Sequence, residues 1–75
     1  MDFRHSDKYR KLGLNVAYYR KDRHFTQEGL AEVIDVDRST IAKIEGATAG
    51  ASMDTLVDIA DALELPAYKL LEFRD

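Results

Sequence analysis

Three groups of residues have side-chain types that could do chemistry, and the spacing of two of them argues against it. His5-Ser6-Asp7 holds the residue types of a hydrolytic triad. Three adjacent residues cannot place nucleophile, base and orienting acid in one chain of hydrogen bonds. The two histidines, His5 and His24, lack the paired spacing of a metal site. We therefore expect no enzyme activity, metal or cofactor, and we interpret residues 1–7 as a flexible N-terminal segment.

The third group is a polar strip within residues 38–45. At about 100° per residue, four side chains of this segment cluster on the side opposite Ile41 and Ile44. They are Arg38, Ser39, Ala42 and Lys43. The small Ala42 would let the backbone enter the major groove of DNA, where arginine, serine and lysine can donate hydrogen bonds to base edges. The alternative is an ordinary solvated helix face, so the strip has to be judged with the elements that position it.

Length and composition limit those elements. The 75 residues permit one domain with a single small core. Cysteine is absent, so disulfides and thiolate metal sites are excluded. The N-terminus carries charges where a signal peptide needs an apolar run, and no stretch approaches the ~20 apolar residues of a membrane span. We expect a cytoplasmic protein without a membrane partner.

Charge is distributed unevenly along the chain, whose formal net charge is −3. Residues 1–24 hold seven Lys and Arg against three Asp and Glu (+4), whereas residues 51–75 hold two against six (−4). The basic first third could meet the phosphates of a nucleic acid. The alternative is a solvated charged surface, which is a common outcome of such asymmetry.

Apolar spacing and capping residues predict helices only. We expect helices over residues 8–21, 27–34, 38–45 and 53–63, and a short last helix that begins at Pro66 and carries Leu70, Leu71 and Phe73. Their expected N-caps are Thr26, Asp37 and Ser52. No strand pattern, repeat or low-complexity tract is present.

Only residues 35–37 separate the second helix from the third. Short helices gain stability by packing, so this turn must bring the two together at a steep angle. The small Ala31 permits close approach. The apolar side chains expected in the seam are Leu30, Ile34, Val36, Ile41 and Ile44. Burying that seam would turn the polar strip outward.

One ordered series of residues spans roughly positions 9–73. It consists of Arg20, Phe25-Thr-Gln-Glu28, Leu30-Ala31, Val36, Ile41, Ile44-Glu45, Ser52-Met-Asp-Thr-Leu56, Ile59-Ala-Asp-Ala-Leu63 and Leu70-Leu71. The series resembles the Cro/repressor-type (XRE-like) helix-turn-helix family. The resemblance implies an all-α, five-helix domain over residues 8–75. It also implies a transcriptional regulator that binds double-stranded DNA as a homodimer, on a roughly palindromic operator. No small-molecule ligand is evident.

The resemblance also implies residue roles. Arg38, Ser39, Ala42 and Lys43 match base-facing positions, and Gln27 matches a position that grips a phosphate at a helix N-terminus. The full set of predicted phosphate contacts is Gln27, Thr40, Lys21 and Arg23. Arg20 and Glu45 match a structural ion pair that locks the recognition helix to the first helix.

Several positions depart from the family pattern. His24 and Asp35 stand where glycine is usual, so both are expected in left-handed backbone. Ala47 and Ala51 replace a glycine and a proline after the third helix, and Ala17 stands where arginine is common.

Two alternatives stay open. The same fold could serve as a protein interaction module, antitoxin-like or a regulatory partner, that does not read DNA, and the acidic pI of about 5.3 is compatible with that reading. The last helix could form the two-fold interface of a dimer or complete the core of the monomer.

Overall fold

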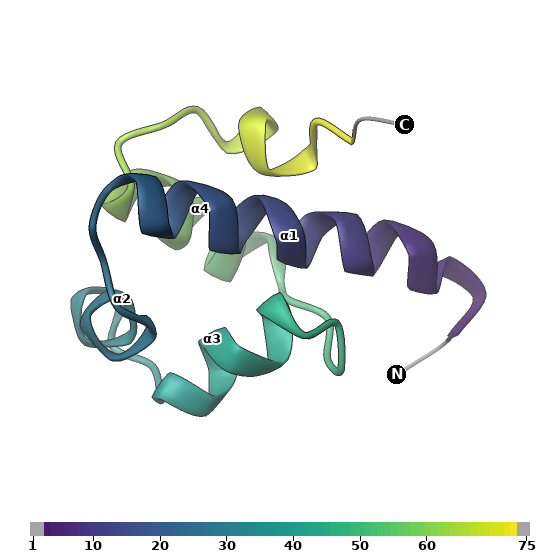
Figure 1. Ribbon diagram of the computed structural model, residues 1–75, viewed down its shortest axis with the longest axis horizontal. Coiled ribbons are helices and arrows are strands. Elements are labelled where there is room, and N and C mark those ends of the chain that lie inside the picture. The colour runs from purple at the N-terminus through teal and green to yellow at the C-terminus, as the bar shows by residue number, and fades with distance from the viewer. Residues whose placement is uncertain (1–2, 74–75) are drawn as a thin grey trace.

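The computed structural model describes residues 3–73, which form four α-helices and two 3-10 helices (Figure 1). They are η1 (Phe3–His5), α1 (Ser6–Asp22), α2 (Gln27–Ile34), α3 (Arg38–Glu45), α4 (Met53–Ala62) and η2 (Ala67–Leu71). No strand occurs within the described residues. The predicted all-α class is confirmed. Within that part of the chain, no helix is long and apolar enough to cross a membrane.

The helix boundaries follow the sequence pattern closely. α2 and α3 have the predicted bounds, and α4 ends one residue before Leu63. α1 begins at Ser6 rather than residue 8 and ends at Asp22 rather than residue 21. The predicted fifth helix is the 3-10 helix η2, which Pro66 precedes as N-cap and which ends before Phe73.

Two of the three predicted side-chain caps form. Thr26 Oγ1 accepts from the backbone N–H of Gly29 at 2.9 Å, and Ser52 Oγ accepts from that of Thr55 at 3.1 Å. Asp37 occupies the N-cap position of α3, but its side chain accepts no hydrogen bond there. The cap prediction for Asp37 is therefore right in position and wrong in mechanism. Any support it gives α3 comes from its charge near the helix N-terminus.

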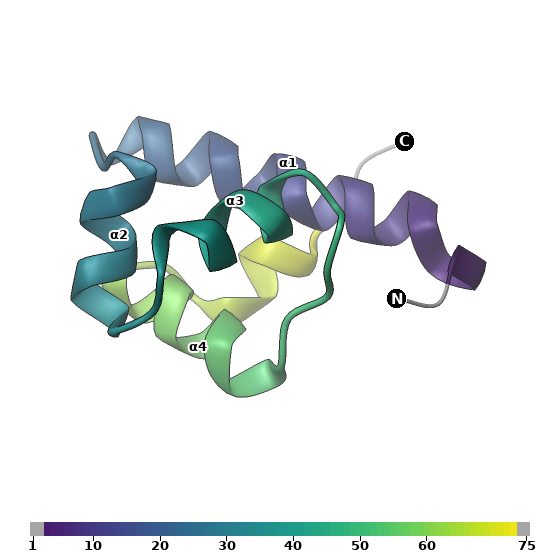
Figure 2. The same cartoon turned by 90° about the horizontal axis from the view of Figure 1, so that it is seen from below.

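The core draws on every element from α1 to η2. Its largest fully buried side chains are Val16, Leu30, Ile41, Ile59, Leu63 and Leu70. Burying an aliphatic side chain of this size contributes about 1.5–3 kcal/mol. Turned by 90°, the molecule shows α1 and α4 along opposite edges with α3 between them (Figure 2). Helices too short to be stable alone are held together in this arrangement.

The seam between α2 and α3 forms as predicted. Leu30 and Ile41 are fully buried and Ile44 nearly so, while Ile34 and Val36 are partly buried against them. Asp35 ends α2 in left-handed backbone with φ 59°, which confirms the expectation for this glycine-like position. His24 is confirmed in the same way with φ 64°. The turn therefore closes without glycine.

A close crossing of α1 and α3 depends on Gly13. A Cβ atom at this position would lie 2.5 Å from the carbonyl oxygens of both Ile44 and Glu45. No side chain fits there unless the backbone of α3 moves. Gly13 therefore fixes how closely the C-terminal end of α3 approaches α1.

The C-terminal segment is tied to α1 by Asn15. Its side-chain amide donates to the carbonyl of Leu70 at 2.9 Å and to that of Glu72 at 3.3 Å. Leu70 is fully buried, whereas Leu71 is 41% exposed. Leu70 thus completes the core of the monomer, and Leu71 faces outward.

Candidate nucleic-acid interface

The polar strip of α3 lies on the surface. Arg38, Ser39 and Lys43 are exposed and Ala42 is half-buried, while Ile41 and Ile44 face the core. Thr40 is also half-buried, one residue from the strip. α3 is the element nearest the viewer in Figure 2, so no other helix covers it from that side. The four predicted base-reading residues are therefore brought together on one accessible helix face.

A buried ion pair fastens α3 to α1. Arg20 Nε donates to Glu45 Oε2 at 2.6 Å and Arg20 Nη2 donates to Glu45 Oε1 at 3.1 Å. Each side chain is only 9% exposed. Arg20 Nη1 also donates to the carbonyl of Phe25 at 2.8 Å, which holds the α1–α2 connection. The guanidinium fork thus bridges three segments, a geometry that lysine could not reproduce.

Gln27 extends this pair toward the surface. Its amide Nε2 donates to Glu45 Oε1 at 3.0 Å, and its Oε1 accepts from Arg38 Nη1 at 3.1 Å. A continuous chain of hydrogen bonds therefore runs from Arg20 through Glu45 and Gln27 to Arg38. The amide nitrogen carries a second hydrogen, so the contact with Glu45 does not exhaust it as a donor. Helical periodicity gave no signal for this chain of hydrogen bonds, because its members lie on three different helices.

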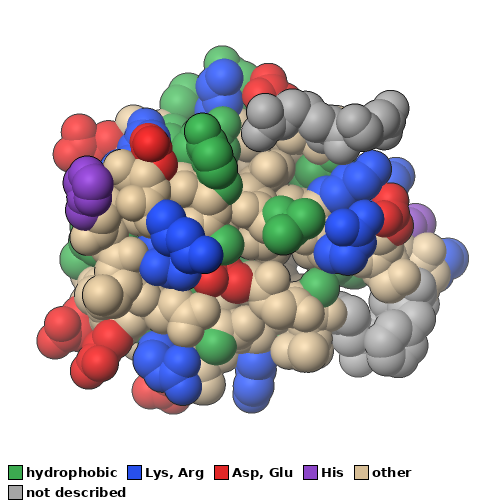
Figure 3. All heavy atoms as spheres, in the orientation of Figure 1, with side chains coloured by type: hydrophobic (Ala, Val, Ile, Leu, Met, Phe, Trp, Pro, Cys, Tyr) green, Lys and Arg blue, Asp and Glu red, His purple; other side chains and the backbone are tan. Residues whose placement is uncertain are grey.

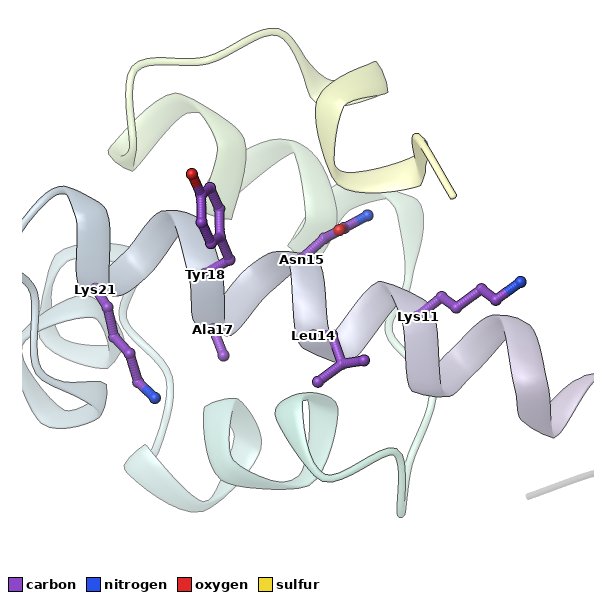
Figure 4. Close-up of a pocket in the computed structure, with 6 residues that line it drawn as sticks. All are labelled: Lys11, Leu14, Asn15, Ala17, Tyr18 and Lys21. Atoms are coloured by element: carbon purple, nitrogen blue, oxygen red, sulfur yellow. The ribbon is translucent and has the colours of Figure 1, made fainter. Parts of the chain in front are cut away.

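Two predicted phosphate-contacting residues on and just after α1 occupy different places. Lys21 is exposed, and its side chain points from α1 toward α3 (Figure 4). Arg23 instead donates from Nε to the carbonyl of Leu63 at 2.9 Å, pairs with Asp22, and lies 5.6 Å from the centre of the Tyr19 ring. These contacts hold Arg23 at the C-terminal end of α4, and none of them reaches α3.

Acidic residues surround the N-terminal end of the strip. A shallow hollow of about 320 Å³ beside Arg38 is lined also by Glu28, Glu32 and Asp37. These carboxylates attract the guanidinium of Arg38 and repel an approaching phosphate. Within residues 3–73, no group of three or more His, Cys, Asp or Glu side chains could hold a metal ion.

Known proteins share this architecture. The family model HTH_3, described as helix-turn-helix, matches residues 16–70. The restriction-modification controller protein C.AhdI from Aeromonas hydrophila superposes with a TM-score of 0.83 at 25% identity, over 85% of this chain and 97% of that one. The hypothetical transcription factor NHTF from Neisseria gives 0.85 at 27% identity, over 89% and 77%.

A third solved structure supports the fold alone. The clp gene regulator ClgR from Corynebacterium glutamicum has a TM-score of 0.81 at 24% identity, over 84% of this chain and 67% of that chain. A comparison with curated protein sequences found no match.

Proposed function

Because the chain belongs to the HTH_3 helix-turn-helix family and is a DNA-binding transcription regulator rather than an enzyme, we propose that it reads a specific operator with α3. In this proposal α3 enters the major groove of double-stranded DNA. The observation that carries it is the outward polar strip of α3, held in place by the α2–α3 seam and by the Arg20–Glu45 pair. Because these contacts fix the position of α3, they lower the entropic cost of placing its side chains against base edges.

Base reading is assigned to the strip. Arg38 and Lys43 can donate to the O6 and N7 acceptors of guanine, and Ser39 can donate to or accept from several bases. The small side chain of Ala42 lets the helix approach the bases closely, so that its neighbours reach the floor of the groove. Gln27 holds Arg38 at 3.1 Å and so limits the directions in which its guanidinium can point. This restraint favours one base position over its neighbours.

Phosphate contacts are assigned around the strip. The first turn of α2 offers N–H groups and a partial positive charge, together with the second amide hydrogen of Gln27. Thr40 on α3 and Lys21 on α1 are assigned to phosphates as well. Arg23 can join them only through its Nη groups, because its Nε donates to the Leu63 carbonyl, and of these Nη1 already pairs with Asp22. These contacts set register and affinity rather than sequence preference.

The proposal includes a homodimer on a roughly palindromic operator. Two recognition helices about 34 Å apart would occupy successive major grooves. The surface proposed for the two-fold contact lies on η2, where Tyr68 is 62% exposed and Leu71 41% exposed. Apolar side chains exposed side by side on a short element favour a partner surface.

Selection of bound sequences from random DNA tests this proposal, with the selection repeated at two salt concentrations. We expect a palindromic motif, and we expect weaker binding at the higher salt because phosphate contacts release counterions. Absence of any enriched sequence at either salt would count against operator reading. It would favour a protein interaction module on the same fold.

A further inference from the structure

The outer side of α1 carries two large apolar side chains that the fold leaves uncovered. Leu14 is 56% exposed and Tyr18 is 58% exposed. They are four residues apart, so they lie on one side of the helix, away from the buried Val16. A shallow hollow of about 480 Å³ runs along them and is lined also by Lys11 and Lys21 (Figure 4). We name Lys11, Leu14, Tyr18 and Lys21 the α1 surface.

The α1 surface is positively charged. Asp7 contacts Arg10 at 2.8 Å and Lys11 at 3.4 Å, and these two cations hold the pKa of Asp7 below its usual value. Lys21 takes part in none of the ion pairs of the described residues, so its charge is available to a partner. Figure 3 shows exposed hydrophobic side chains on this face between groups of Lys and Arg side chains. A partner for this surface has to be both apolar and acidic.

The chain itself presents a helix face that is both acidic and apolar. Asp54, Asp58 and Asp61 follow one another at helical spacing on the outer side of α4, and no basic residue occurs in this helix. Met53 and Val57 beside them are 60% and 37% exposed. None of these aspartates takes part in an ion pair within residues 3–73. We name these five residues the α4 surface.

The two surfaces lie on opposite sides of the molecule. α1 runs along one edge in Figure 2 and α4 along the other, with α3 facing the viewer between them. The buried residues of each helix face inward, so the α1 and α4 surfaces point away from each other. A contact of either surface with its own copy would bring like charges together, which opposes a two-fold arrangement.

We propose that the α1 surface docks on the α4 surface of a second copy of this chain, head to tail. Leu14 and Tyr18 of one copy meet Met53 and Val57 of the other, and Lys21 meets the aspartates. Such a contact joins different surfaces, so it does not close on itself and extends with concentration. It is separate from the two-fold contact proposed on η2, but it uses Lys21 and therefore competes with the phosphate contact proposed for that residue. It also requires no DNA.

Reciprocal charge reversal tests the contact. The variants Lys21→Glu and Asp58→Lys each place like charges across it, one from each side. Sedimentation of the DNA-free protein over a wide concentration range, at low and high salt, measures the association. We expect the wild-type chain to form species larger than a dimer at low salt, and fewer at high salt because the contact is partly ionic. Each reversal should weaken this association at least about tenfold.

Mixing the two variants gives the decisive result. In an equimolar mixture, the reversed α1 surface of one variant meets the reversed α4 surface of the other, so association should return. Glu32→Lys serves as the matched control, because it makes the same charge change as Asp58→Lys on an exposed residue of α2 outside both surfaces. It should associate like wild type. The proposal is overturned if wild type never exceeds a dimer, if either reversal leaves association unchanged, or if the mixture stays dissociated.

Discussion

Glu45→Ala removes the carboxylate that holds Arg20 and tests whether this ion pair fastens α3 to α1. Arg20 and Glu45 are each 9% exposed, so the substitution leaves a buried guanidinium without its counter-charge. Stranding one member of a buried pair costs about 3–5 kcal/mol. A domain of this length has only about 4–11 kcal/mol of stability, at roughly 0.05–0.15 kcal/mol per residue. At about 4–8 °C per kcal/mol, the melting temperature should fall by roughly 12–40 °C.

Urea denaturation of four proteins measures this effect as a double-mutant cycle. They are wild type, Glu45→Ala, Arg20→Met and the double variant, in which no buried charge is stranded. The double variant should be more stable than the sum of the single losses predicts, by about 3 kcal/mol or more. Asp7→Ala is the control, because Asp7 contacts Arg10 at 2.8 Å in an exposed pair, where a small change is expected. A loss below about 1 kcal/mol for Glu45→Ala would show that the pair behaves like an exposed one and does not fix α3.

Three further predictions follow from single residues. Ala47→Gly should raise the free energy of unfolding by about 1 kcal/mol in urea denaturation, because Ala47 has φ 58° and the left-handed region disfavours a Cβ atom. No gain would contradict this. Gly13→Ala should lower the free energy of unfolding by about 1–3 kcal/mol or more, because the added carbon would overlap two carbonyl oxygens of α3. A neutral result would mean that α3 shifts freely. In titrations against matched and mismatched duplexes, Arg38→Ala should lose about 1–3 kcal/mol of discrimination at one base pair, whereas Lys21→Ala should weaken all duplexes alike. Equal loss on every duplex for Arg38→Ala would remove it from base reading.

The sequence predicted the parts of the fold that local signals specify. Thr26 and Ser52 mark helix starts because their hydroxyls satisfy backbone N–H groups that no residue within the helix can reach. Asp35 departs from the glycine that is usual at this turn, but its short polar side chain tolerates the left-handed backbone expected there. The α2–α3 seam followed from apolar spacing. Each of these signals lies within a few residues of the feature it specifies.

Apart from the Arg20–Glu45 pair, which the family resemblance implied, contacts between distant segments escaped sequence reasoning. Nothing local distinguishes Gly13 from a glycine inside any helix, although its hydrogen faces carbonyl oxygens of α3. The Gln27 amide bridges Glu45 and Arg38, and such a bridge depends on the angle between α2 and α3. Nothing in the sequence near Arg23 indicates that its side chain donates to the Leu63 carbonyl at the C-terminal end of α4. Side-chain roles at the interface therefore depend on packing more than helix positions do.

Amide chemical-shift mapping with a selected operator duplex tests whether the outward strip of α3 is the surface that reads DNA. Backbone amides of ¹⁵N-labelled protein report which residues meet the DNA. We expect the largest changes at Arg38, Ser39 and Lys43 and in the first turn of α2, with little change along the outer side of α4. Changes concentrated on α4 or η2, with the amides of α3 unmoved, would contradict this assignment.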